Sequence, residues 1–147
     1  MTSAAVDAGR IVVGVDGSPS SLAALDWAAR QGELTGSSLE LVMAWEWPTS
    51  YGAPFVFTTE WNPAADAAKV LDGAVATLRA AHPGLAIDST VVEGHPAVAL
   101  VGASEGAQLL VVGCRGHGEF AGMLLGSVSE HCVTNAHCPV LVMRDGK

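Results

Sequence analysis

Five short runs of mostly apolar residues, separated by segments with helical spacing, constrain the fold of this chain most strongly. The first run, Ile11–Val15, is continuously apolar, which is typical of a strand covered on both faces. The other expected strands are 38–45, 86–92, 109–112 and 139–143, and the expected helices are about 18–33, 62–82, 96–105 and 127–136. This alternation with short connections predicts an α/β fold, in which helices cover both faces of one open, five-stranded parallel sheet. Pro139 favours an edge position for the last strand.

Composition and charge narrow the classes of function. Half of the residues are hydrophobic and 15% are charged, which argues against intrinsic disorder, and 147 residues fit a single domain. The formal net charge is −8 and only seven residues are Lys or Arg, so a nucleic-acid partner is not expected. We predict one domain at 10–144, between a flexible N-terminal tail at 1–9 and a C-terminal tail at 145–147.

Neither a secretory signal nor a membrane span is expected. Residues 1–9 lack a basic run followed by an apolar core, and no apolar run approaches the roughly 20 residues that cross a bilayer. The three cysteines, Cys114, Cys132 and Cys138, are an odd number, which fits a reducing compartment. We therefore expect a cytoplasmic protein.

The turn after the first strand carries an acidic residue at the edge of the sheet where ligands bind. Asp16 follows the strand directly, and the carboxyl ends of parallel strands form that edge. Ser18 and Pro19 then predict a helix start, with a capping hydroxyl before proline at the first helical position. We expect Leu22, Leu25 and Ala29 on one apolar face of this helix. Asp16 alone would also fit a turn residue that only flanks the helix.

A glycine-rich segment follows the fourth expected strand. The run Leu109–Val112 leads into Gly113, and Gly116, Gly126 and Ser127 follow before the last helix. A strand, a glycine-rich loop and a helix N-terminus together present backbone N–H groups to an anion. We expect Gly113 to omit a Cβ where a ribose or base presses on the backbone, Gly116 to permit a positive φ, and Ser127 to cap the helix and donate to a phosphate. The segment lacks the lysine of a P-loop and is not placed like the dinucleotide fingerprint.

The spacing of these glycines resembles the signature of a known family. The universal stress protein family, in its nucleotide (ATP)-binding subgroup, has the pattern Gly-x2-Gly-x9-Gly-Ser/Thr, which is matched here by Gly113-x2-Gly116-x9-Gly126-Ser127. Residues 13–18, 124–129 and 138–142 resemble further motifs of that family, so the likeness covers nearly the whole chain. The resemblance implies a Rossmann-like fold, similar to the adenine nucleotide alpha hydrolases, with sheet order 3-2-1-4-5.

The resemblance also implies how an adenine nucleotide would bind at this edge. Asp16 would hold the ribose, and the backbone of Ala44, at the end of the second strand, would contact the adenine. Gly113 and Gly116 would line the ribose and phosphates, and the start of the last helix would hold phosphate oxygens. The full set of predicted binding residues is Gly14, Val15, Asp16, Ala44, Gly113, Arg115, Gly116, Gly126, Ser127, Val128 and Ser129.

The roles of three other residues of the loop region can each be interpreted in more than one way. Arg115 is the only cation of the loop and either reaches a phosphate or is solvated. His117 as a catalytic base is the less favoured interpretation, and we predict no catalytic residue. Cys114 could present an exposed reactive thiol, although nothing in the sequence indicates a lowered pKa.

Two His-Cys pairs, at 131–132 and 137–138, raise the question of a zinc site. The last helix is expected to end near residue 137, so we predict that the pairs do not converge and that no metal is bound there. Cys132 fits the buried face of that helix together with Val128.

An aromatic stretch occupies the connection after the second strand. Six of the eight aromatic residues of the chain lie within Trp45–Trp61. Connections of this length are usually functional or mobile. This stretch either packs on the edge of the sheet, or forms a lid that closes over the adenine or docks a partner.

The sequence thus predicts a regulatory, stress-response protein that binds ATP with Mg²⁺ and does not turn it over fast. No loop lysine is present to stabilise charge at a leaving phosphate, and no residue is placed to activate water. The alternatives are a cyclic AMP-binding protein, a slow ATPase or nucleotidyl transferase that uses the same pocket, and an interaction module whose output is dimerisation. The resemblance implies a homodimer joined through the apolar fifth strand, Val140–Met143, and an unpaired apolar edge would favour aggregation.

Overall fold

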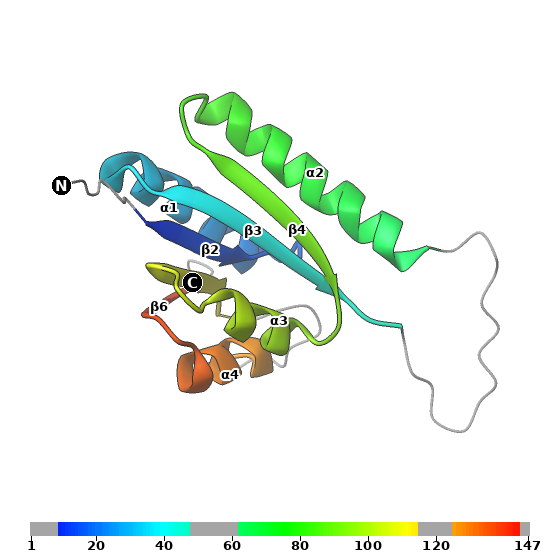
Figure 1. Cartoon of the computed structure of the whole chain (residues 1–147). Coiled ribbons are helices and arrows are strands. Elements are labelled where there is room, and N and C mark those ends of the chain that lie inside the picture. Colours follow the sequence, from blue (N-terminus) through cyan, green and yellow to red (C-terminus); the bar gives the residue numbers. More distant parts are fainter. Residues whose placement is uncertain (1–8, 48–61, 115–124, 145–147) are drawn as a thin grey trace, which may run out of the picture.

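The computed structural model describes residues 9–47, 62–114 and 125–144, which form one parallel sheet with helices on both faces (Figure 1). The elements in chain order are β2 (Arg10–Gly14), α1 (Pro19–Thr35), β3 (Ser38–Trp45), α2 (Pro63–Ala81), β4 (Ile87–Glu93), α3 (Pro96–Ala103), β5 (Leu109–Gly113), α4 (Ser127–Asn135) and β6 (Val140–Met143). The strand order in the sheet is β4-β3-β2-β5-β6. Counted along the chain this order is 3-2-1-4-5, so the predicted fold class and strand order are confirmed.

Two apolar cores lie on the two faces of the sheet. On β2, Ile11 and Val13 pack with side chains of α1 and α2, whereas Val12 packs with Leu100 of α3 and Cys132 of α4. The three β2 side chains are at most 1% exposed. Figure 1 shows the same division, with α2 on one side of the sheet and α3 and α4 on the other. Burial on both faces explains why the central strands are continuously apolar.

Side-chain caps begin α1 and α2 where the sequence predicts them. The hydroxyl of Ser18 accepts a hydrogen bond from the N–H of Ser21, and proline is the first residue of α1. Asn62 caps α2 in the same way. At α4 the prediction is wrong, because Gly126 is the N-cap and Ser127 is already the first helical residue. The backbone of Gly126 is extended and its carbonyl accepts the first helical hydrogen bond, so the Ser127 hydroxyl is not the cap.

One residue of the apolar face predicted for α1 is exposed. Leu22 is 54% exposed, whereas Leu25 is buried as expected. Burial in α1 falls largely on small residues, including Ala24 and Ala28, which allow the helix to lie close to the sheet. Leu22 lies on the flank of the helix and lines a hollow between α1 and α2.

The last strand, β6, is an edge strand, as Pro139 predicts. The carbonyl of Pro139 accepts the N–H of Leu110, and the carbonyl of Met143 accepts the N–H of Cys114. Since the backbone groups of successive strand residues face opposite sides, those of Val140 and Val142 point toward the outer edge. Within the described ranges, no strand covers that edge.

The predicted N-terminal tail meets the described residues at Gly9, whose carbonyl accepts the N–H of Ser38. The predicted tail segments 1–8 and 145–147 lie outside the described residues. Among the helices that the structure describes, none combines the length and apolarity needed to cross a bilayer.

Candidate functional site

The strand order reverses between β2 and β5, and a crevice opens there at the carboxyl ends of the strands. Ligands of open parallel sheets bind at this kind of switch point. The crevice is lined by Gly14, Val15, Asp16, Ser21, Val42, Ala44, Pro96, Leu100, Val112, Gly113, Gly126, Val128 and Ser129. Of the predicted binding residues that the structure describes, all line the crevice except Ser127, which is exposed beside it.

One wall of the crevice is the turn at Asp16. Its carboxylate Oδ1 accepts a hydrogen bond from the N–H of Ser18 at 2.8 Å, which fixes the turn into α1. Asp16 is nevertheless exposed at the crevice, so the turn role and contact with a ligand are compatible. Its carboxylate accepts hydrogen bonds from hydroxyl groups and repels phosphate.

A second part of the crevice lining is the start of α4, which is hydrogen-bonded to the end of β5. The carbonyl of Cys114 accepts the N–H of Gly126 at 2.7 Å and the hydroxyl of Ser129 at 2.9 Å. Ser129 is 2% exposed and also contacts the carbonyl of Gly126 at 3.1 Å. The hydroxyl proton of Ser129 is therefore already donated to backbone carbonyls. In this conformation the side chain holds the start of α4 in place and does not donate to a phosphate.

The N-terminus of α4 carries groups that can bind an anion. No side chain caps this helix in the described part of the chain, and the N–H groups of a first helical turn have no partner within the helix. Val128 lines the crevice beside the exposed Ser127. The helix dipole adds positive potential at this end, so an anionic group is favoured at the α4 side of the crevice.

Gly113 has a different reason to be glycine from the one predicted. A Cβ at Gly113 would lie 2.8 Å from the backbone carbon of Ser20 and from the nitrogen of Ser21. The missing Cβ therefore makes room for the first turn of α1, which is a reason for glycine that holds without a ligand. A Cβ at Gly14 would come within 2.8 Å of Leu100 Cδ1, the end of a flexible side chain, so that position is more tolerant.

The apolar back of the crevice was not predicted from the sequence. Pro96 and Leu100 of α3 line the crevice together with Val42 and Val112 of the sheet, and Leu100 belongs to the same core cluster as the two valines. These residues belong to no motif, since contact between separate elements brings them together. The alternation of strands and helices could have indicated them, because α3 also begins at the carboxyl edge of the sheet.

The chain is similar in sequence to a family of known proteins. A model of the universal stress protein family matches residues 8–144. The chain belongs to this family. Two universal stress proteins of Mycobacterium tuberculosis are 36% and 35% identical to it over 152 and 141 residues, respectively. These alignments cover 92% and 91% of this chain but 47% and 43% of the relatives, so the chain spans about half of their length.

Solved structures of universal stress proteins also resemble the chain. One, a universal stress protein in complex with cAMP, is 31% identical, with a TM-score of 0.71 over 94% of this chain and 98% of that chain. A family member from Burkholderia pseudomallei is 27% identical, with a TM-score of 0.63 over 92% of this chain and 95% of that chain. The resemblance stated from the glycine pattern is thus confirmed at the level of the family.

The thiols of this universal stress protein are mostly shielded. Cys114 is 5% exposed, so an exposed reactive thiol there is excluded in this conformation. Burial raises the pKa of Cys132 from 9.0 to about 11, and Cys132 packs near Val128 as predicted. Burial also raises the pKa of Cys138, an effect opposed by the guanidinium of Arg10.

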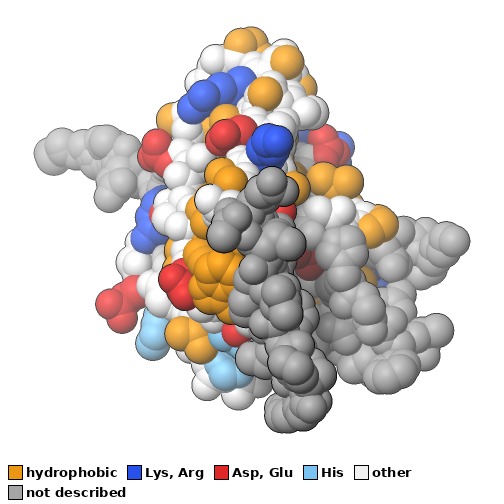
Figure 2. Space-filling model, turned by 90° about the vertical axis from the view of Figure 1, so that its right-hand side faces the viewer, with side chains coloured by type: hydrophobic (Ala, Val, Ile, Leu, Met, Phe, Trp, Pro, Cys, Tyr) orange, Lys and Arg blue, Asp and Glu red, His pale blue; other side chains and the backbone are white. Residues whose placement is uncertain are grey.

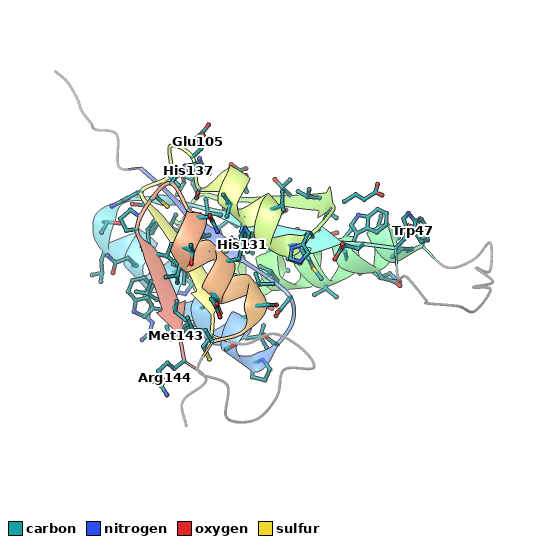
Figure 3. The ribbon with its side chains drawn as sticks, turned by 90° about the horizontal axis from the view of Figure 1, so that it is seen from below. Trp47, Glu105, His131, His137, Met143 and Arg144 are labelled. Atoms are coloured by element: carbon teal, nitrogen blue, oxygen red, sulfur yellow. The ribbon has the colours of Figure 1, made fainter. Side chains whose placement is uncertain are left out.

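The His-Cys pairs do not form a metal centre in the described residues. Searched over those ranges, the chain has no group of three or more His, Cys, Asp or Glu residues that could hold a metal ion. Figure 3 places His131 on α4 and His137 beyond its end, where the N–H of His137 donates to the buried hydroxyl of Ser104. The second pair therefore belongs to the packing of the α3–α4 side.

Some predicted features lie outside the described residues. These are Arg115, Gly116 and His117 of the loop, and residues 48–61 of the aromatic stretch. At the start of that stretch, the rings of Trp45 and Trp47 meet edge to face, with centroids 5.4 Å apart. Figure 3 shows Trp47 at the far end of β3, away from α4.

Proposed function

We propose that this universal stress protein is a regulatory module that binds an adenine nucleotide in the crevice between Asp16 and α4. The observation that carries the proposal is that one crevice is lined both by a carboxylate suited to ribose hydroxyls and by a helix N-terminus suited to phosphate, which no side chain of the described residues caps. The related universal stress protein in complex with cAMP supports an adenine nucleotide as the class of ligand. The apolar side chains of Pro96, Leu100 and Val112 provide a surface for a base.

ATP, bound with Mg²⁺, is the nucleotide that we propose first, because the glycine pattern resembles that of the ATP-binding subgroup. Cyclic AMP is the second candidate, and the cAMP complex of the 31% identical relative favours it specifically. Both nucleotides share the adenosine that the crevice would hold. They differ in the anion that the α4 side must accommodate.

We further propose that the protein binds its nucleotide without fast hydrolysis. Among the described residues that line the crevice, Asp16 is the only ionisable one, and the ribose role would occupy it. Fast phosphoryl transfer needs stabilisation of the charge at the leaving phosphate and a positioned nucleophile, and these lining residues include neither a Lys or Arg side chain nor a second carboxylate or a histidine that could activate water. A nucleic-acid partner is not proposed, because Lys and Arg side chains lie scattered among acidic ones on the face seen in Figure 2.

A homodimer joined through β6 is also part of this proposal. The outer edge of β6 presents the backbone of Val140 and Val142, and all four residues of the strand are only half-buried. Pairing of this edge with a second copy would satisfy those backbone groups and cover apolar surface.

Calorimetric titration of ATP with Mg²⁺, and of cAMP, into the wild type and Asp16→Ala tests the proposal. We expect the wild type to bind at least one of the two, and Asp16→Ala to bind it at least tenfold more weakly, since a hydrogen bond to a charged group is lost. Asp72→Ala, which removes an exposed aspartate of α2, is the control and should bind like the wild type. Wild-type affinity in Asp16→Ala would show that the site is misplaced, and rapid phosphate release from ATP would overturn the assignment as a non-enzyme.

A further inference from the structure

The turn that carries Asp16 is held by a closed set of hydrogen bonds that centre on Ser21. The hydroxyl of Ser21 accepts the N–H of Asp16 at 3.1 Å and contacts the carbonyl of Gly14 at 3.3 Å, to which it donates. The N–H of Ser21 donates to the hydroxyl of Ser18 at 3.3 Å, and the N–H of Ser18 donates to Oδ1 of Asp16 at 2.8 Å. Ser21 thus connects the end of β2, the turn and the first turn of α1.

Ser21 lies between this turn and the crevice. It is 2% exposed and is one of the crevice-lining residues, although it belongs to no predicted binding motif. A serine hydroxyl has one proton to donate and two lone pairs to accept with, so it can serve a carbonyl and an N–H at once. Alanine has neither function, and its substitution would leave the N–H of Asp16 and the carbonyl of Gly14 without this partner.

We infer that Ser21 is a positioning residue for ribose recognition: it acts through Asp16 by fixing the backbone from which the carboxylate reaches the ribose hydroxyls. This inference rests on the proposed function. The backbone N–H and the carboxylate of Asp16 are both held, the first by Ser21 and the second by the N–H of Ser18. Two anchors on one residue fix its direction, and a carboxylate fixed in advance binds hydroxyls with a smaller entropy cost.

The inference predicts a selective effect on the sugar, because the Ser21 hydroxyl holds the backbone N–H of Asp16, the residue that reads the ribose. Loss of the Ser21 hydroxyl should weaken the contact with the 2′-hydroxyl and leave the contacts of the base and the phosphates nearly unchanged. A general loss of stability would weaken all nucleotides alike. The ratio of affinities between a ribonucleotide and its 2′-deoxy form therefore separates positioning from a merely structural role.

The chain offers a matched control for this substitution. Ser104 is 0% exposed, its hydroxyl donates to the carbonyl of Val101 at 2.6 Å, and it accepts the N–H of His137 at 2.9 Å. Its pattern of one donated and one accepted hydrogen bond matches that of Ser21. Ser104 does not line the crevice, so Ser104→Ala removes a similar buried hydroxyl without touching the Asp16 turn.

The test is a calorimetric titration of full-length wild type, Ser21→Ala and Ser104→Ala with ATP, 2′-deoxy-ATP, cAMP and 2′-deoxy-cAMP. We expect the wild type to prefer the ribonucleotide about tenfold, the size of one hydrogen bond to a charged group. In Ser21→Ala this preference should fall to about twofold or less, whereas Ser104→Ala should keep it. Circular dichroism establishes that each variant is folded. Ser21→Cys, which keeps the shape of the side chain with a larger and weakly hydrogen-bonding sulfur atom, replaces Ser21→Ala if alanine prevents folding.

The results distinguish a failure of the positioning role of Ser21 from a failure of the proposed function. A wild-type preference for the ribose that persists in Ser21→Ala or Ser21→Cys overturns the positioning role while the proposed function stands. A preference lost equally in Ser104→Ala overturns it too, because the effect would then be general. A wild type that binds none of the four nucleotides contradicts the proposed function itself.

Discussion

The backbone of Gly113 approaches the first turn of α1 so closely that a Cβ there would lie 2.8 Å from the backbone carbon of Ser20. The carboxyl end of β5 and the start of α1 are thus in direct contact beneath the crevice. Both elements also contribute to the crevice, through Gly113 and through Ser21. The geometry of the proposed nucleotide site therefore depends on this backbone contact.

Substitution Gly113→Ala should reduce stability, because the new Cβ would press on backbone atoms that cannot turn away. We expect a loss of about 1–3 kcal/mol in the free energy of unfolding, measured by urea denaturation. Gly73→Ala is the control: nothing lies within 4 Å of a Cβ at this exposed position of α2, and alanine should stabilise the helix by about 0.5–1 kcal/mol. Equal stability of Gly113→Ala and the wild type would contradict the close packing of α1 on β5.

Removal of the Ser129 hydroxyl should cost about 1 kcal/mol in the free energy of unfolding. The hydroxyl is buried and donates to the carbonyl of Cys114, which keeps its second hydrogen bond from Gly126, so the loss is limited. Thermal or urea unfolding of Ser129→Ala measures it. Thr134→Ala removes an exposed hydroxyl from the same helix and should stay within about 0.5 kcal/mol of the wild type. If the two substitutions cost the same, Ser129 does not fix the end of β5 to α4.

Stability should fall at alkaline pH through Cys132. Burial raises its pKa from 9.0 to about 11, so below pH 9 the thiol is neutral in both the folded and the unfolded chain. Between pH 9 and 11 the unfolded chain ionises first, and a stabilisation of up to about 2–3 kcal/mol is lost. Urea unfolding between pH 9 and 11 should show a smaller decline in the free energy of unfolding for Cys132→Ala than for the wild type, whatever the stability of the variant at pH 7. Parallel declines in the two proteins would exclude this contribution.

A proline at Val142 should prevent dimerisation while the fold survives. The N–H of Val142 points to the outer edge, so proline removes no hydrogen bond to β5. Val142→Ala is the matched control, since it also loses the packing of the side chain but keeps the N–H. Light scattering after size exclusion should show dimers for the wild type and Val142→Ala and monomers for Val142→Pro. Dimeric Val142→Pro, or a monomeric wild type at high concentration, would exclude the β6 interface.

Much of the fold could be predicted from the sequence because local signals mark its elements. Ser18, Pro19 and Asn62 begin helices where they are expected, and continuous apolar runs mark strands with two covered faces. The strand order follows from no local signal and came from the family resemblance. The exposure of Leu22 does not follow from the sequence, because helical periodicity alone does not show that the small residues of α1 face the sheet.

The candidate site was predictable to the extent that motifs mark it. Asp16 and Val128 line the crevice as expected, and Ser127 lies at its side. The reason for Gly113 and the role of Ser21 could not be predicted, because both depend on contacts that exist only after α1 packs on the sheet. The apolar wall of α3 was missed for the same reason.

The most direct test of the central claim is a heteronuclear NMR titration of the labelled protein with ATP and Mg²⁺, and separately with cAMP. We expect one or both nucleotides to shift the backbone amide signals of Gly14, Ala44 and Val128, which line the crevice and not the hollow between α1 and α2. The amides of Val70 and Ala74, which line the hollow between α1 and α2 on the other face, should stay in place. Shifts confined to that hollow, or none with either nucleotide, would contradict the account.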